Sequence, residues 1–508
     1  MLGVNPIPRG RDVLVLNALL ILSGIAVVAT LYPVLFSPLG PIDDHEYLKY
    51  RFLNPTGDLL LGARQGLDRA WEEFTNEGRV RPLYQLGRTV STSLIAVNAP
   101  IRYAFRLVTA IGVVLALSKY AMKQNSPYPL MIHQRLLLGA TCTALSLTLL
   151  PWADVVGRLG PPDILGILGL LIAGTAFENQ SWPHLAHQNK QPRRAIVVFL
   201  FGLLLAAGSR ESYAIHAAII ALAAIAFIVR SRINIGRTIM ATLVLIALFP
   251  TTALLALRAR GGRDFYGESR TVGGSLDLFI DFLSSDLFIR ITPIVALWFF
   301  LTESSKRVLV CWQALIGIGM MGADYVQYST ALSTYGRYRF ISDLCFVLAS
   351  LGALKALLLI PSRFNFRARF WWTFRTCTVI VLATLLTNAA LGLQDVHAQF
   401  QYARRLNLGF SLVVEELLEH VEESQPDSVS IIIDPDSQSY RAHDLQERSL
   451  GLYWFLRHYI TTTIKVDRFA LSGSYNGYGK NTFCIFLGAS PPLSIESKLR
   501  CESQVKLY

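Results

Sequence analysis

The chain has 508 residues, of which 52% are hydrophobic and 16% are charged, and its formal net charge is +12. Many apolar stretches reach about 20 residues, the length that crosses the hydrocarbon core of a bilayer. This composition excludes an ordinary soluble enzyme. A nucleic-acid partner is not expected either, because the arginines cluster in short connections between apolar runs. We therefore expect an α-helical polytopic membrane protein.

About eleven apolar segments are predicted to span the membrane. The first, 13–36, follows Arg9 and Arg11, and it is longer than the apolar region of about 7–15 residues in a signal peptide. The others are 101–122, 133–151, 162–178, 195–208, 213–229, 237–257, 287–303, 307–328, 340–360 and 374–393.

The charges of the connections set the predicted orientation. With the N-terminus in the cytoplasm, every connection on the inner side is basic, as the positive-inside bias requires. The basic residues concerned are Lys119, Lys123, Lys190, Arg193, Arg194, Arg230, Arg232, Arg237, Lys306, Arg307, Arg363, Arg367 and Arg369. An odd number of spans then places the C-terminus outside. We expect a multi-pass protein of the cell membrane.

Two regions are too long and polar to be simple connections. The first outer loop, about 37–100, is predicted to form interfacial helices. The tail, 396–508, alternates helix-like and strand-like patterns, such as FSLVVEELLEHVEE and SVSIIID, and predicts a small extracytoplasmic α/β domain. Residues 1–395 then form the transmembrane domain. If the tail faces an oxidising compartment, Cys484 and Cys501 could form a disulfide.

The stretch PIDDHEYLKYRF, 41–52, places three carboxylates and an imidazole just after the first span. Asp43 and Asp44 could simply cap the helix that follows. A divalent metal held with His45 and Glu46 is the alternative, although adjacent residues rarely complete a metal site without distant ligands. No cofactor is otherwise indicated.

Arginines recur in the other outer connections, against the positive-inside bias. They lie in EGRVRPLYQLGR, AAGSRESYAIH, LRARGGRDFYGESR and STYGRYRFISD, and the candidates are Arg79, Arg81, Arg88, Arg210, Arg258, Arg260, Arg263, Arg337 and Arg339, with Glu211 and Tyr338 beside them. Loop ion pairs or lipid headgroup contacts would explain them. A phosphate site is the sharper alternative, because guanidinium forks match phosphate oxygens.

Acids in one outer loop facing arginines from several others would suit a transferase whose donor has an anionic leaving group. A carboxylate would take the proton of an incoming hydroxyl, while arginines would stabilise the departing phosphate. The residues alone do not separate Asp43 from Asp44 or Glu46 as the base.

Four stretches resemble motifs of the glycosyltransferase C superfamily, which are integral-membrane enzymes that use polyprenyl-phosphate sugars. IDDHEYLKYRFLNP resembles its acidic first-loop motif, and RVRPLYQLGRTVSTSLIAVNAPIRYAFRLV its Arg-Pro-Leu stretch. GSRESYAIHAAIIAL is similar to its Ser-Lys-Glu turn, with Arg210 in place of the lysine, and YGRYRFISDLCFVLA to a late Arg-Tyr motif, with Arg339 where the family pattern is more aromatic. The resemblance covers about 13–360.

This resemblance implies sugar transfer from a polyprenyl-phosphate donor to a glycan, lipid or protein acceptor. It implies that Asp43 is the general base and that Asp44 contacts the acceptor or a metal. Arg81, Arg210 and Arg337 would bind the lipid phosphate, with Glu211 orienting one of them. Glu46, Tyr338, Arg260 and Arg263 complete the candidate substrate-binding residues.

Two other functions remain open. An O-antigen-type polymerase or ligase would also use polyprenyl-linked glycans and outer arginines, but with a weaker acidic first-loop motif. A transporter or flippase is disfavoured, because its polar groups would lie near the bilayer midplane between paired repeats. Here the charges lie at span ends, and no clear repeat is present.

Overall fold

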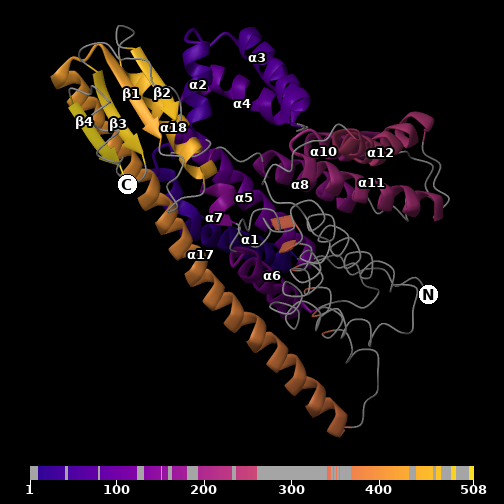
Figure 1. Ribbon diagram of the computed structural model, residues 1–508. Coiled ribbons are helices and arrows are strands. Elements are labelled where there is room, and N and C mark those ends of the chain that lie inside the picture. The colour runs from indigo at the N-terminus through magenta and orange to yellow at the C-terminus, as the bar shows by residue number, and fades with distance from the viewer. Residues whose placement is uncertain are drawn as a thin grey trace.

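The described part of the chain is mostly helical in the computed structural model (Figure 1). The structure describes residues 10–40, 44–77, 81–122, 131–149, 152–157, 159, 163–179, 193–230, 236–259, 340–358 in part, 368–433, 442–460, 465–470, 482–487 and 503–507.

Each of the seven segments predicted to span the membrane between residues 13 and 257 coincides with a helix. They are α1 (Gly10–Leu31) with the 3-10 turn η1 (Tyr32–Phe36), α5 (Ala99–Met122), α6 (Ile132–Leu147), α8 (Asp163–Asn179), α10 (Arg193–Ala207), α11 (Glu211–Arg230) and α12 (Arg237–Ala259). A short helix, α7 (Trp152–Val156), precedes α8. Within the described residues, α1 with η1 and α5 are long and apolar enough to cross a membrane by length and composition. The count of eleven spans stays a prediction.

Glycines allow α8 and α10 to pack backbone against backbone. A Cβ atom on Gly169 would lie 2.5 Å from the backbone nitrogen of Ala206, and one on Gly202 would lie 2.5 Å from that of Ala173. Small residues at such crossings are typical of helices that associate within a bilayer, where van der Waals packing replaces the hydrophobic effect.

The predicted first outer loop folds into α2 (His45–Leu53), α3 (Leu59–Glu72), the π-helical turn η2 (Glu73–Glu77) and α4 (Pro82–Ile95). Asp58 caps α3 by accepting hydrogen bonds from the amides of Leu60 and Leu61, at 2.8 and 3.3 Å. Pro82 begins α4 at the position where a missing N–H costs nothing. The prediction of helices in this loop is confirmed; their contact with a membrane stays a prediction.

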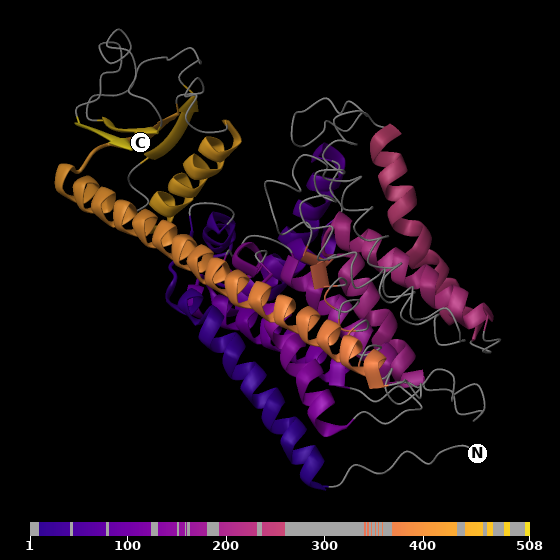
Figure 2. The same ribbon diagram turned by 90° about the horizontal axis from the view of Figure 1, so that it is seen from below.

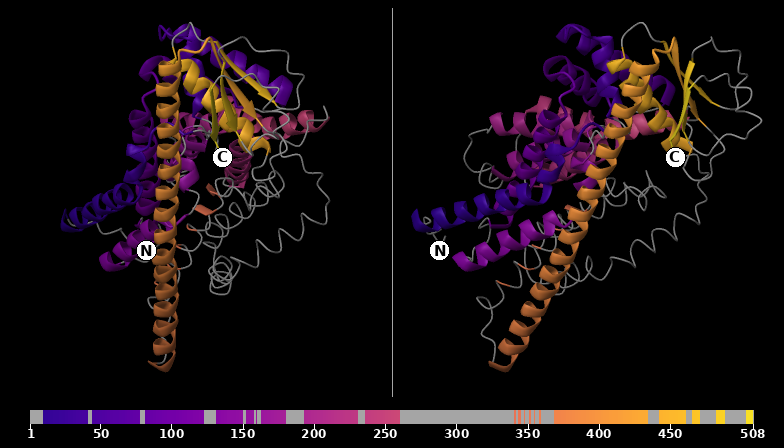
Figure 3. Two further views of the ribbon diagram at one scale, coloured as in Figure 1. Left: turned by 60° about the vertical axis from the view of Figure 1, so that its left-hand side comes forward. Right: turned by 90° about the vertical axis from the view of Figure 1, so that its left-hand side faces the viewer.

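One helix, α17 (Ala368–Ser424), runs without interruption for 57 residues from the last predicted span into the tail (Figures 2 and 3). The sequence between Pro361 and Pro426 contains no proline, so nothing in it forces a break. The helix ends where Gln425 takes a positive φ of 44° directly before Pro426. The domain boundary expected between residues 395 and 396 therefore lies inside a helix.

The tail forms an α/β unit on the end of α17, as expected for its fold class (Figure 1). Its strands are β1 (Ser428–Ile433), β2 (Lys465–Ala470), β3 (Thr482–Leu487) and β4 (Ser503–Leu507), arranged β2-β1-β3-β4 with every pairing parallel. Helix α18 (Ala442–Tyr459) connects β1 to β2. Its residues Leu452 and Leu456 share a buried core with Val429 of β1 and Leu417 of α17.

Candidate functional site

Asp44 joins the first outer loop to the segment before α8. The residue is 1% exposed. One carboxylate oxygen accepts the amide of Gly40 at 2.8 Å, and the other accepts the amide of Leu159 at 2.9 Å. The hydroxyl of Tyr103, on α5, lies beside this carboxylate. The two amides come from separate parts of the sequence, so the Asp44 carboxylate acts as a buried cross-link.

Tyr47, one turn further along α2, supports the same junction. Its hydroxyl donates to the carbonyl of Leu159 at 3.0 Å, and Arg106 of α5 donates to the carbonyls of Val155 and Leu159. Burial raises the pKa of Tyr47, so the phenol stays protonated and remains a donor. The backbone on the N-terminal side of α8 is thus held by side chains of both α2 and α5.

Glu46 forms an ion pair with Arg88, a buried residue of α4. The guanidinium of Arg88 also lies over the ring of Tyr84, 4.2 Å from its centroid. Stacking on an aromatic face leaves the edges of the guanidinium to bind carboxylates, which suits Arg88 for this position. The predicted substrate-binding residue Glu46 is therefore paired with an arginine from the same outer loop.

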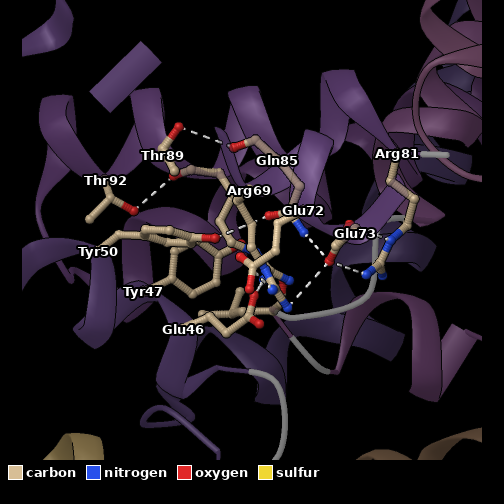
Figure 4. A network of polar contacts seen from close by, with 12 residues as sticks. Glu46, Tyr47, Tyr50, Arg69, Glu72, Glu73, Arg81, Gln85, Thr89 and Thr92 are labelled. Atoms are coloured by element: carbon tan, nitrogen blue, oxygen red, sulfur yellow. Dashed lines mark hydrogen bonds and ion pairs between the residues drawn. The ribbon is translucent and has the colours of Figure 1, made fainter. Parts of the chain in front are cut away.

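Arg81 is held by a carboxylate that was not among the expected site residues. Glu73, at the start of η2, is 1% exposed and accepts from Nε and Nη2 of Arg81, at 3.2 and 2.5 Å (Figure 4). The side chain of Gln85 donates to the same carboxylate at 2.6 Å, and Arg69 approaches it at 3.7 Å. Glu73 follows Arg69 by one helical turn in the sequence, and that spacing is the signal that could have identified it.

Tyr50 extends this network toward α2. Its hydroxyl donates to the side-chain oxygen of Gln85 at 3.3 Å. Burial, together with the nearby Glu46 carboxylate, raises the pKa of Tyr50, so it too remains a neutral donor. Figure 4 shows a continuous chain of contacts that runs from Tyr50 through Gln85 and Glu73 to Arg81. The network thereby connects α2 to η2 and to α4.

Arg210 lies directly before α11 and pairs with a second unexpected acid. Its Nη1 atom is 3.1 Å from an oxygen of Asp163, the first residue of α8, and both residues are buried. The other Asp163 oxygen makes no hydrogen bond within the described part of the chain. In the sequence Asp163 follows two prolines at the beginning of a predicted span, where an acid is interpreted as a helix cap.

A backbone contact brings the Arg81 and Arg210 motifs together. The amide of Leu83 in α4 donates to the carbonyl of Gly208 at 2.9 Å. Arg81 lies two residues before Leu83, and Arg210 lies two residues after Gly208. A Cβ atom on Gly208 would lie 2.6 Å from the Leu83 side chain, so glycine permits the approach. Two motifs more than 100 residues apart thus meet at one end of the helices.

Several expected site residues lie outside the described part of the chain. They are Asp43, Arg79, Arg260, Arg263, Arg337, Tyr338 and Arg339. Of Glu211 and Arg258, the structure describes only their places in α11 and α12. Over the residues that the structure does describe, no three His, Cys, Asp or Glu side chains gather into a group that could hold a metal ion.

Comparison with known proteins gives no relative for this chain. No protein-family model matches it, and neither a curated protein nor a solved structure does so. The residues and their geometry are therefore the basis on which a function can be proposed.

Proposed function

We propose that the chain is an integral-membrane glycosyltransferase. It moves a sugar from a polyprenyl-phosphate donor to an acceptor hydroxyl on the extracytoplasmic face. One observation carries the proposal: three motifs distant in sequence converge at one end of the helices. Asp44 bonds to Leu159, Leu83 of the Arg81 motif bonds to Gly208, and Arg210 pairs with Asp163.

The helix ends support the proposed orientation. The contacts just described join ends that the charge pattern assigns to the outer side. Ends assigned to the inner side also meet one another, since Arg135 donates to the carbonyl of Met122 at 3.0 Å and Gln134 donates to that of Leu358 at 3.3 Å. In a bundle whose helices alternate in direction across the membrane, the outer ends lie together and the inner ends lie together.

The surface of the bundle is also suited to lipid. Large apolar side chains are exposed on helix after helix, including Leu14 and Ile21 of α1, Val108 of α5, Val197 of α10, Val229 of α11 and Leu245 of α12. Apolar exposure on this scale is costly in water and marks a surface that contacts a membrane or a partner. In the proposed enzyme these side chains face the acyl chains.

Asp43 is assigned as the general base, because the neighbouring acids are already engaged. Asp44 accepts two backbone amides, and Glu46 pairs with Arg88. In the proposed step, Asp43 takes the acceptor hydroxyl proton and the acceptor oxygen bonds to the anomeric carbon. The bond from that carbon to the phosphate oxygen breaks, and its electron pair leaves with the lipid phosphate.

The arginines are assigned to the leaving group, which gains negative charge as the bond breaks. Arg81 and Arg210 lie near the Leu83–Gly208 contact and are oriented by Glu73 and Asp163. Arg337, with Arg260 and Arg263, would complete this set. Guanidinium groups that are fixed before the reaction stabilise developing phosphate charge without reorganising during the step.

The test uses purified protein in vesicles with a radiolabelled polyprenyl-phosphate sugar and candidate acceptors. Transfer of a single sugar by the parent is expected, together with a loss of about 10²- to 10⁴-fold in Asp43→Asn. Asp68→Asn is the matched control, since this acid of the same loop is 73% exposed. Transfer only of preassembled glycan chains would replace the proposal with a polymerase or ligase. Movement of the lipid-linked sugar across the bilayer without any product would replace it with a transporter.

A further inference from the structure

Helix α18 of the tail packs directly on α2, the helix that begins at the first-loop acids (Figure 1). The rings of Trp454 and Phe52 are 5.9 Å apart. The guanidinium of Arg457 lies 4.8 Å from the centroid of Phe52, and the ammonium of Lys49 lies 5.9 Å from that of Trp454. Aromatic and cation–π pairs of this kind are specific in geometry, so they fix the angle and register of α18 on α2.

A second contact from the tail side reaches the residues just before those acids. Asn407 of α17 is buried and donates to the hydroxyl of Tyr103 at 3.2 Å. A Cβ atom on Gly40 would lie 2.6 Å from the side-chain oxygen of Asn407, so the two residues are in close contact. Gly40 in turn donates its amide to Asp44. Asn407 therefore packs against Gly40, whose amide bonds to Asp44, and against Tyr103, whose hydroxyl lies beside Asp44.

Helix α18 is itself firmly attached to α17. Phe455 and Phe410 form an edge-to-face pair with centroids 5.1 Å apart. Leu456 of α18 and Val414 of α17 lie in the same buried core. The two contacts with the first loop, one at Gly40 and one on α2, consequently come from one packed unit.

We propose that the tail is a positioning element of the site, with Trp454, Arg457 and Asn407 holding α2 and Gly40. In the sequence, Asp43 lies between Gly40 and α2. A general base must be held within hydrogen-bonding reach of the proton that it removes. The docking of α18 does not depend on the proposed transferase activity, whereas its catalytic consequence rests on that activity.

The first test follows turnover. Trp454→Ala removes the stacking partner of Phe52, and Asn407→Ala removes the contact with Gly40 and Tyr103. Each is expected to lower kcat about 10- to 100-fold, because a small misplacement of a reacting group has effects of this size. The KM for the lipid donor should change little, since neither residue belongs to the proposed phosphate site. Trp454→Phe keeps an aromatic ring and should restore most of the activity.

The second test follows docking without any substrate. Hydrogen–deuterium exchange of the α2 amides should be faster in Trp454→Ala than in the parent, and near the parent rate in Trp454→Phe. Tyr402→Ala is the control on α17, because Tyr402 is 66% exposed. It should change neither kcat nor exchange.

The outcomes separate this inference from the proposed function. Faster α2 exchange without loss of turnover in Trp454→Ala and Asn407→Ala would overturn the positioning role while leaving the transferase intact. Unchanged α2 exchange would overturn the docking itself. If the parent transfers no sugar, the proposed function fails, and the exchange experiment still decides whether the tail holds α2.

Discussion

Replacing Asp44 is expected to cost stability first and activity only as a consequence. In Asp44→Ala the amides of Gly40 and Leu159 both lose their acceptor in a fully buried position. A buried donor left unpaired costs about 1–3 kcal/mol, so two should cost about 2–6 kcal/mol. Asp44→Asn keeps one carbonyl oxygen and turns an N–H group toward the other amide, and it should cost about half as much.

The measurement is thermal unfolding in detergent, followed by the helical circular dichroism signal, alongside sugar transfer at a temperature where each variant is folded. Asp43→Asn should show the opposite pattern, with near-parent stability and little transfer. Asp68→Ala, on the exposed face of α3, controls for the loss of a carboxylate as such. An Asp44→Asn protein that unfolds with the parent and yet transfers no sugar would refute the assignment, because Asp44 would then be a chemical participant rather than a cross-link.

Three further predictions concern the arginines, the helix packing and the tail. Arg81→Lys cannot keep both bonds to Glu73, so donor binding or turnover should fall about 10- to 150-fold, measured with labelled lipid donor. Arg210→Lys should cost less, because a lysine ammonium can also make the contact with Asp163. Parent-like behaviour of Arg81→Lys and Arg337→Lys would move the phosphate site to Arg260 or Arg263. Gly202→Val places a side chain against the backbone of α8 and should lower the free energy of unfolding by at least about 1–3 kcal/mol. Gly174→Ala is the control and should not lower it, because no atom lies within 4 Å of the new Cβ. Equal unfolding temperatures of the two variants would contradict the close packing of α8 on α10. Burial and the nearby Arg51 lower the pKa of His458, so the imidazole binds a proton more readily when α18 is undocked or unfolded. Docking of α18 should therefore weaken as the pH falls below about 6.5, which hydrogen–deuterium exchange of α2 would measure. His458→Gln should remove this pH dependence.

Most of the helices could be predicted from the sequence, because long apolar runs have few alternatives to a helix. The segments 101–122 and 213–229 each match their helix closely, at α5 and α11. The parallel strands β1 and β3 were signalled by short apolar runs such as SVSIII and TFCIFL. The domain boundary was less predictable, because a change from apolar to amphipathic composition does not interrupt a helix that contains no proline.

The sequence predicted several of the charged residues of the candidate site, but it did not predict which residues they pair with. The charged residues at the predicted outer ends included Asp44, Glu46, Arg81 and Arg210, and the structure brings their motifs together. Their partners Glu73 and Asp163 were missed, since a glutamate in an amphipathic helix and an aspartate at a helix start each have an ordinary local explanation. Which acid meets which arginine depends on how distant helices pack, and that information is not contained in the spacing of either motif.

Because α17 is one continuous helix, a tilt at one of its ends displaces the other end. At a rise of about 1.5 Å per residue, a helix of 57 residues is about 85 Å long. A tilt of about 10° about one end would displace the other by about 15 Å on this geometry. Hydrophobic mismatch changes the tilt of membrane helices, so bilayer thickness acting on the predicted span would be transmitted along α17 to the sheet. The lipid composition around the protein would then change the force that acts on the α18–α2 contact.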